Sequence, residues 1–130
     1  MNEQVVRQPA VAGSFYPGEP DALRGMVRQL LERAPGGHAV PCAMVVPHAG
    51  YIYSGYTAAC GYRALPKSDA ARPLRVFILS PSHRAALNGV SVGDYRAYLT
   101  PLGEVEIDQE LVQRLLALPD VSRDMASHQQ

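Results

Sequence analysis

Apolar positions recur at helical spacing in three stretches of the chain. The first predicted helix starts after Asp21, a candidate N-cap, and is expected to close at the Gly36-Gly37 pair. A second helix is predicted over residues 55–65 with Ser54 as its cap, and a third after Asp108. The apolar stripe of the first helix consists of Leu23, Met26, Val27, Leu30 and Leu31, and that of the third of Leu111, Leu115 and Leu116.

Shorter apolar runs predict strands between these helices. Residues 39–46, "AVPCAMVV", are an apolar run broken only by Pro41 near its start, and 74–80, "LRVFILS", are a continuous run; residues 89–103 are a weaker strand with a turn. An unbroken run is typical of a strand covered on both faces, so 74–80 is expected to be central and parallel to 43–46. Strand, helix and strand then form a right-handed βαβ unit. The predicted fold class is α/β, a central and mainly parallel sheet flanked by helices in a single domain.

Composition narrows the range of partners. The chain has 130 residues, with 12 basic and 12 acidic side chains, so its charge indicates neither nucleic acid nor anionic lipid as a partner. No apolar run approaches the ~20 residues that cross a bilayer, and the first residues do not resemble a secretory signal. Two cysteines make no disulfide framework. We expect a cytoplasmic protein with no membrane association.

Two histidines follow the predicted strands at equivalent places. His48 follows 43–46 after Pro47, and His83 follows 74–80 after Pro81 and Ser82. The carboxyl ends of parallel strands are where open α/β sheets bind ligands, so two imidazoles leaving one edge could share a divalent ion. Pro47 and Pro81 cannot donate to a ladder and help to end each strand, while Gly50 permits a tight turn.

Spacing alone leaves two interpretations of these histidines open. A histidine at a strand end is commonly a hydrogen-bonded structural residue, whereas two in matching positions favour a metal or catalytic site. Two interpretations are also open for three tyrosines, which could line a pocket or simply pack against neighbours; they are Tyr16, Tyr51 and Tyr53. Three carboxylates could join a site, although Asp108 is better explained as a helix cap; they are Asp94, Glu104 and Asp108.

Five segments, read in order, resemble one family. They are "PAVAGSFYP", "PHAGYIYSG", "ILSPSH", "YLTPLGEVEID" and "SHQQ". From about Arg7 to the last residue the chain resembles the Memo family, also known as protein B of the AmmeMemoRadiSam set. That family is similar to the LigB-type, class III extradiol dioxygenases, whose α/β fold carries a mononuclear non-haem iron site. The resemblance implies that this chain is the N-terminal half of such a fold.

The resemblance also assigns site residues. It implies that His48 and His83 are the first two metal ligands, with iron or copper as the metal, and that Tyr16, Tyr51 and Tyr53 shape a substrate pocket. His128 resembles a histidine beside the pocket and is the candidate for catalytic proton transfer. The third ligand is a cysteine in the later half of the family's fold. The chain alone is therefore expected to bind metal weakly or as a dimer, and to aggregate.

Two functions follow from the resemblance. One is metal-dependent redox chemistry on a small molecule, related to dioxygenase chemistry. The other is a non-enzymatic adaptor that binds a phosphopeptide in the same cleft, although no arginine cluster marks a phosphate site. Association with a radical-SAM protein is a further implied partnership. If the chain by itself held a metal tightly, Asp94, Glu104 or His128 would be the first candidates for the third ligand.

Overall fold

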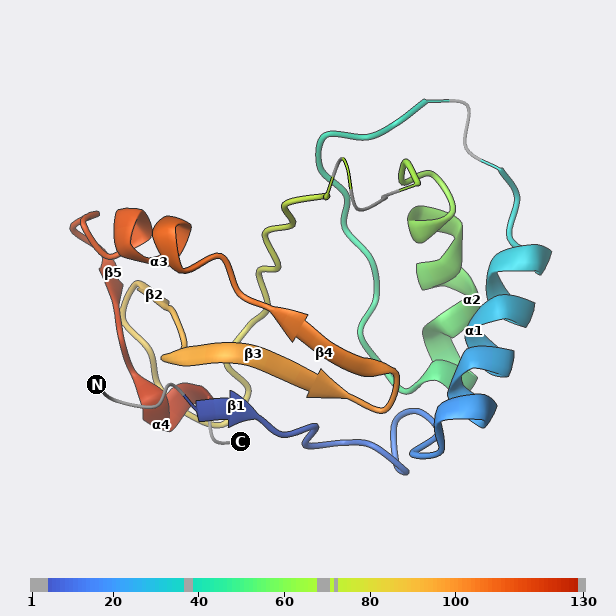
Figure 1. Ribbon diagram of the computed structural model, residues 1–130, viewed down its shortest axis with the longest axis horizontal. Helices are drawn as coiled ribbons and strands as arrows, with labels where there is room; N and C mark the ends of the chain where they lie inside the picture. The colour runs from blue at the N-terminus through green and yellow to red at the C-terminus, as the bar shows by residue number, and fades with distance from the viewer. Residues whose placement is uncertain (1–4, 37–38, 68–70, 72, 129–130) are drawn as a thin grey trace. The chain divides into compact units, whose positions relative to one another are not determined.

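The computed structural model describes residues 5–36, 39–67, 71 and 73–128, and the statements below concern these residues. The described chain forms two compact units. One contains the described residues of Met1–Ala10 and Arg75–Gln130, and the other is Val11–Leu74. Their elements follow in chain order (Figure 1): β1 Val5–Arg7, α1 Pro20–Arg33, α2 Tyr51–Tyr62, β2 Val90–Ser91, β3 Tyr95–Thr100, β4 Gly103–Glu106, α3 Gln109–Leu115, β5 Val121–Ser122 and α4 Met125–His128.

The first unit is organised by two small sheets. β3 is central to one of them, parallel to β1 and antiparallel to β4, with Ala97 opposite both Val6 and Glu106. Ala97 is fully buried, as expected for the middle strand. The second sheet pairs β2 and β5 in parallel, with Ser91 opposite Ser122. Helices and partly parallel sheets confirm the α/β class.

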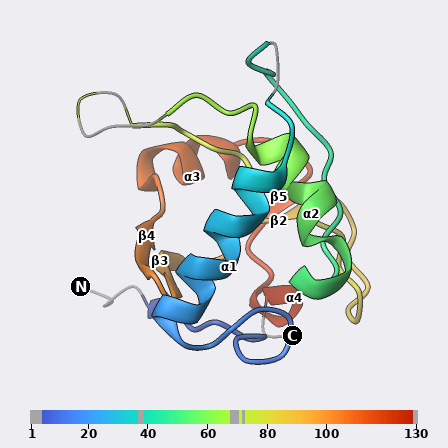
Figure 2. The ribbon, with the colours of Figure 1, turned by 90° about the vertical axis from the view of Figure 1, so that its right-hand side faces the viewer.

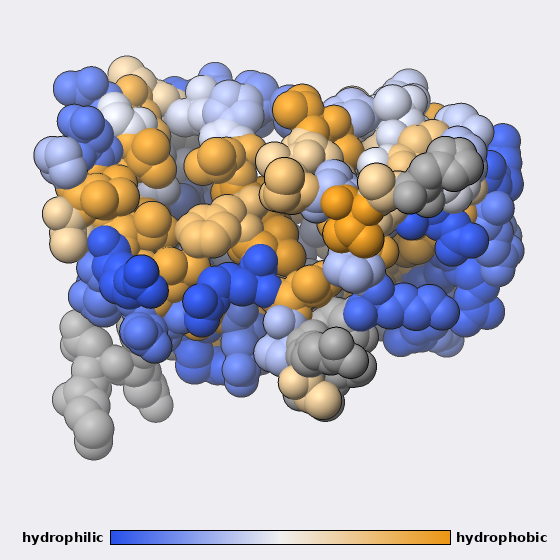
Figure 3. Space-filling view, turned by 90° about the horizontal axis from the view of Figure 1, so that it is seen from above, coloured by the Kyte–Doolittle hydropathy of each residue, from blue (hydrophilic) through white to orange (hydrophobic). Residues whose placement is uncertain are grey.

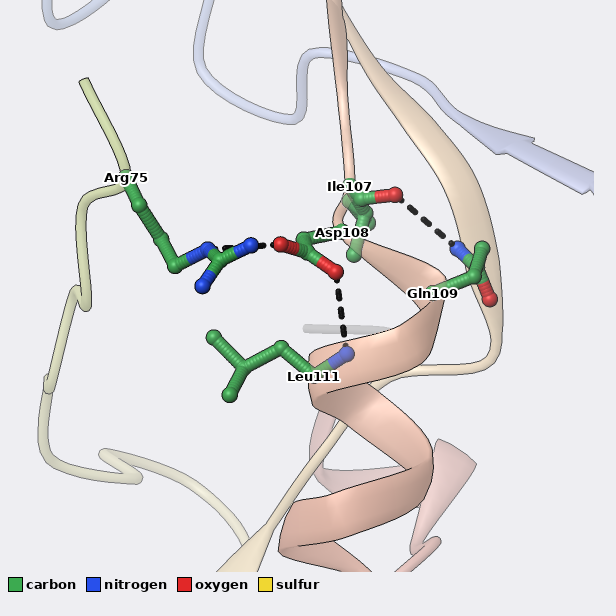
Figure 4. A network of polar contacts seen from close by, with 5 residues as sticks. All are labelled: Arg75, Ile107, Asp108, Gln109 and Leu111. Atoms are coloured by element: carbon green, nitrogen blue, oxygen red, sulfur yellow. Dashed lines mark hydrogen bonds and ion pairs between the residues drawn. The ribbon is translucent and has the colours of Figure 1, made fainter. Parts of the chain in front are cut away.

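Helix α3 begins where its cap was predicted. Asp108 Oδ1 accepts a hydrogen bond of 2.9 Å from the Leu111 backbone N–H, one of the amides that a first helical turn leaves without a helical acceptor. The other carboxylate oxygen pairs with Arg75 Nε at 2.7 Å (Figure 4). Val112 is the buried residue of this helix, whereas the three leucines of the predicted stripe are only half-buried.

Helix α1 confirms the predicted stripe, but both of its predicted ends shift. The helix begins at Pro20 with Glu19 as N-cap, and Asp21 lies in its first turn, where it pairs with Arg24 at 2.8 Å. Proline is favoured in a first helical turn because its missing N–H would have no helical acceptor there. At the other end, Pro35 disfavours a helical conformation for Ala34, and the helix stops at Arg33. Gly37, part of the predicted stop, lies outside the described residues.

Helix α2 packs beside α1 in the second unit (Figure 2). It begins at Tyr51 with Gly50 as N-cap, so the predicted cap at Ser54 is wrong and Ser54 lies inside the helix. Two glycines permit close approach: a Cβ on Gly55 would lie 2.9 Å from Leu30 Cδ1 of α1, and one on Gly61 would lie 2.7 Å from Val46 Cγ1. These glycines therefore leave room on α2 for close packing of α1 and of the segment that precedes α2.

The two predicted strands at 43–46 and 74–80 are wrong for this structure. Neither segment belongs to a strand, so the predicted βαβ unit is absent from the described residues. A segment becomes a strand only when a neighbouring segment supplies the ladder, and the sheets of the described residues include neither of these two. Val45 is fully exposed, and Ile78 and Leu79 are each 85% exposed. Figure 3 shows apolar side chains reaching the surface.

In the described ranges, the buried apolar residues are few and mostly small. They are Leu23, Ala34, Ala59, Tyr95, Ala97 and Val112. Each unit therefore buries few large apolar side chains, and many long apolar side chains remain at the surface. In the part of the chain that the structure describes, no helix has both the length and the apolar character needed to span a bilayer.

Candidate functional site

His48 lies at the entrance of helix α2. It is exposed and stands two residues before Gly50, whose extended backbone (φ −51°, ψ 146°) turns the chain into the helix. The turn is held from two directions. Tyr51 N–H donates to the Phe15 carbonyl at 2.8 Å, and the Ser54 hydroxyl donates to the Ala49 carbonyl at 3.1 Å. The backbone that presents His48 is therefore tied to a segment more than thirty residues earlier in the chain.

Tyr16 and Tyr51 are brought together at this entrance. Their ring centroids lie 5.6 Å apart at an interplanar angle of 46°, a favourable tilted arrangement. Burial raises the pKa of the Tyr51 phenol, and the nearby Tyr62 and Tyr16 raise it further. Tyr53 does not join this pair. Residues two positions apart in a helix point to different sides, and the Tyr53 side chain is 82% exposed. The pocket role of these three tyrosines stays a prediction.

His83 lies in the other compact unit. It is exposed and follows the apolar segment 74–80, in a turn where the Ser82 hydroxyl donates to the Ala85 carbonyl at 2.6 Å. His48 belongs to the Val11–Leu74 unit. The joint role of the two histidines therefore stays a prediction.

His128 is packed among polar and aromatic groups of its own unit. Its Nε2 lies 3.0 Å from Ser91 Oγ, and its backbone carbonyl accepts from Arg7 Nη2 at 3.0 Å. Its ring meets the Tyr95 ring edge-on at 6.3 Å. These contacts tie α4 to strands β1, β2 and β3.

The environment of His128 favours its neutral form. Burial lowers the pKa of the imidazole, and the positive charge of Arg7 lowers it further; a backbone hydrogen bond with Ser91 and the charge of Asp124 act in the opposite direction. A neutral imidazole can accept a proton, as the predicted transfer role requires. Asp124 Oδ1 accepts from Ala126 N–H at 3.0 Å, and this carboxylate oxygen therefore caps the following turn.

The carboxylates considered as ligands are engaged elsewhere. Asp94 pairs with Arg123 at 3.0 Å, and Glu104 pairs with Arg96 at 2.9 Å. A carboxylate whose negative charge is already paired with an arginine is less available as a ligand to a metal ion. Among the described residues, no three His, Cys, Asp or Glu side chains gather as a metal site requires.

The contact between Ser91 and His128 was not expected from the sequence. Ser91 lies in "GVSVG", a polar position in a weak strand pattern, and no local motif joins it to a histidine 37 residues later. Arg7 was likewise not among the candidate residues; it lies in β1 and also covers the Tyr98 ring at 5.5 Å. A local signal existed only for Asp124, an aspartate just before a short helical segment.

Comparison with known proteins gives consistent matches. A family model described as "Memo-like protein" matches residues 7–130. A MEMO1 family protein of Aquifex aeolicus is 40% identical over 123 residues, which cover 95% of this chain and 44% of that protein. One of Methanocaldococcus jannaschii is 43% identical over 119 residues, covering 85% of this chain and 41% of the relative. One of Thermococcus onnurineus is 39% identical over 121 residues, covering 91% and 40%. The chain spans less than half the length of these curated relatives.

Proposed function

Because the chain belongs to the Memo-like protein family, we propose that it contributes His48 and His83 as two nitrogen ligands of a mononuclear metal centre. The observation that carries the proposal is the braced turn at the entrance of α2. Two hydrogen bonds hold the backbone directly after His48, while its side chain stays exposed. A ligating residue whose backbone is already fixed loses less conformational entropy when it binds a metal.

We propose that the remaining ligand comes from outside the described residues. Their donors do not form a three-ligand group, and the relatives contain more than twice the length that this chain covers. We therefore place the third ligand in the uncovered part of the relatives' fold. Imidazole suits iron, copper and zinc alike, and a thiolate as third ligand would favour copper or iron. A metal with open positions would supply redox chemistry on a small molecule.

The residues around His48 would support such a centre without taking part in ligation. The Phe15 carbonyl accepts a hydrogen bond from the Tyr51 N–H and thereby holds the turn. The paired Tyr16 and Tyr51 rings would offer apolar surface and two hydroxyl groups beside the metal. Burial raises the pKa of the Tyr51 phenol above its ordinary 10.0, and this phenol can donate a hydrogen bond to a bound anion or carbonyl. We place His128 as a proton acceptor only in the completed fold.

A phosphopeptide-binding adaptor is the alternative function. A phosphate commonly binds free amides at the start of a helix. At α2 the Tyr51 amide donates to Phe15, and the Tyr53 and Ser54 amides donate to Gly50, so three of the amides there already have acceptors. The metal function is therefore the better supported of the two. We place either function in the cytoplasm, and a radical-SAM protein remains a proposed partner.

Metal analysis of two proteins tests the proposal. One is the 130-residue chain, and the other, called the fusion chain, is the same chain followed by the part of the Aquifex aeolicus relative that the match does not cover. Both are equilibrated separately with iron(II), copper(II) and zinc, freed of loose metal, and measured by elemental analysis. We expect tight binding in the fusion chain and weak binding in the chain alone.

Substitutions make the test specific. His48→Ala and His83→Ala should each weaken metal binding by the fusion chain at least about tenfold, since even residues that only support a ligand have effects of that size. His128→Ala is the matched control and should retain the metal. Equal metal content in wild type and the His48→Ala, His83→Ala double variant would overturn the proposal. A phosphopeptide that binds equally well with and without chelator would favour the adaptor instead.

A further inference from the structure

Residues 76–79 form an apolar segment that is open on both sides. Val76 and Phe77 are 62% and 60% exposed, and Ile78 and Leu79 are each 85% exposed. If this segment forms a strand, its successive side chains point to opposite faces. Apolar residues at four successive positions therefore place apolar surface on both faces of the segment. Scattered exposed apolar residues are ordinary, but a continuous run of this kind marks a contact surface.

The backbone of this segment is suited to strand pairing. Pro73 and Pro81 flank the segment, and no proline interrupts it, so each of its residues can donate an N–H to a ladder. The described structure pairs no strand with it. Its residues Val, Phe, Ile and Leu also have the side chains that favour pleated, covered strands.

Both ends of the segment are anchored while its middle stays open. On one side, Arg75 Nε pairs with Asp108 Oδ2 at 2.7 Å, and Asp108 caps α3 (Figure 4). On the other side, the Ser82 hydroxyl donates to the Ala85 carbonyl and closes a turn. The residues on both sides of the segment are therefore held in place within their unit. A partner strand would pair with a backbone edge whose position is already fixed.

We propose that residues 76–79 are a strand-docking surface, and that its occupant is the part of the fold that the relatives carry and this chain does not cover. The length of the relatives supports this occupant, since the chain covers only 40–44% of three of them. The proposal does not depend on metal binding. It concerns which surface of this chain joins the remainder of the fold.

A second copy of the chain is a poorer occupant. The equivalent segment of another copy could supply one ladder edge, but it would leave apolar side chains of the new pair uncovered. A strand that is apolar on both faces needs elements above and below it as well as beside it. The uncovered part of the relatives is longer than this whole chain and can supply strands and covering helices together.

Amide hydrogen exchange in the chain and the fusion chain tests the proposal. In the chain alone, the amides of Val76 to Leu79 should exchange rapidly. In the fusion chain they should exchange at least about a hundredfold more slowly, as strand amides of a folded core do. Mixing the chain with the separately produced uncovered part of the Aquifex aeolicus relative should give a one-to-one complex with the same protection.

Two variants identify the surface. Ile78→Lys places a charge in the segment and should abolish the complex and the protection. Leu118→Lys replaces an exposed leucine (52%) that follows α3 outside the segment, and should leave both unchanged. Circular dichroism of each variant chain checks that its helices are retained.

Three outcomes would overturn the proposal. The first is a folded fusion chain in which Val76 to Leu79 still exchange rapidly. The second is a chain that self-associates with these amides protected and is not dissociated by the uncovered part, which would identify a second copy as the occupant. The third is an unfolded fusion chain together with a mixture in which no complex forms.

Discussion

The hydroxyl of Ser91 and the imidazole Nε2 of His128 meet at 3.0 Å, although 37 residues separate them along the chain. The same hydroxyl accepts from Asp124 N–H at 3.1 Å and lies 3.1 Å from the Asp124 carbonyl. A serine hydroxyl has one donor and two acceptor positions, so these partners use its full capacity. One side chain of β2 therefore joins the strand to the turn before α4 and to α4 itself.

Replacing Ser91 by alanine should destabilise the protein. The change removes these hydrogen bonds and leaves the half-buried Asp124 amide without its acceptor, at a cost of about 1–2 kcal/mol in the free energy of unfolding. Urea unfolding followed by circular dichroism measures the change. Ser122→Ala, at the exposed residue paired with Ser91 in the β2–β5 ladder, is the control and should change stability by less than about 0.5 kcal/mol. Equal losses in the two variants would contradict the anchoring role of Ser91.

The lowered pKa of His128 predicts a loss of stability in mild acid. As the pH falls below 6.5, the ordinary pKa of histidine, the unfolded chain takes up a proton that the folded chain resists. The free energy of unfolding should therefore decrease in this range, and His128→Gln should remove part of the decrease. Unfolding measured between about pH 7.5 and 5.5 covers the window. The same slope in both proteins would show that His128 does not cause it.

The positive charge of Arg7 should contribute to this pH dependence. Arg7→Gln removes the charge beside His128, so the pKa of His128 should rise and the slope below pH 6.5 should flatten. Arg28→Gln, at an exposed position of α1 in the other unit, removes the same charge from the chain without touching His128. Chemical shifts of the His128 ring measured against pH report its pKa directly. If both arginine variants shifted it equally, local charge would not be the cause.

Two substitutions at Asp108 should separate its two contacts. Asp108→Ala removes both the acceptor for Leu111 N–H and the ion pair with Arg75, whereas Asp108→Asn keeps a neutral acceptor for the cap. The alanine variant should lower the urea midpoint more than the asparagine variant. Arg75→Ala removes the ion pair alone and should resemble asparagine, because exposed pairs contribute little. Equal midpoints for Asp108→Ala and Asp108→Asn would show that the cap contributes nothing.

Acid should weaken the same cap. The hydrogen bond from Leu111 lowers the pKa of Asp108 below its ordinary 3.8, and Arg75 acts in the same direction. The stabilising effect of the carboxylate is present above pH 3.8 and is lost as the pH falls through the lower folded value. The stability difference between wild type and Asp108→Asn should therefore shrink in acid. A difference that persists below that pKa would contradict this account.

The Tyr16 and Tyr51 rings should be energetically coupled. Stability measurements on Tyr16→Leu, Tyr51→Leu and the double variant should give a coupling of about 0.5–1.5 kcal/mol, the range for paired aromatic rings. The parallel cycle of Tyr16→Leu with Tyr53→Leu is the control, since Tyr53 is exposed on a different side of α2. Additive effects in the first cycle would mean that the ring contact does not hold the entrance of α2.

Features that depend on a few neighbouring residues were predictable. The Asp108 cap and the apolar stripe of α1 were both recognised, because a helix closes its hydrogen bonds within four residues and buries residues at a fixed spacing. The α/β class was also predicted correctly, although the two strands from which it was inferred, 43–46 and 74–80, are not strands in the structure. The helix starts were predicted less well. Asp21 and Ser54 have side chains that commonly cap helices, but α1 begins at Pro20 after Glu19, and α2 begins at Tyr51 after Gly50.

Features that depend on distant partners were decided by tertiary structure. The apolar runs at 43–46 and 74–80 have strand composition, but a strand also requires a neighbouring backbone, and β1 became a strand because β3 lies beside it. At the candidate site, the sequence itself pointed to His48 and His83 as the residues of interest. Only the folded chain placed Phe15 against Tyr51 and Ser91 against His128, because these contacts join residues that no local pattern relates.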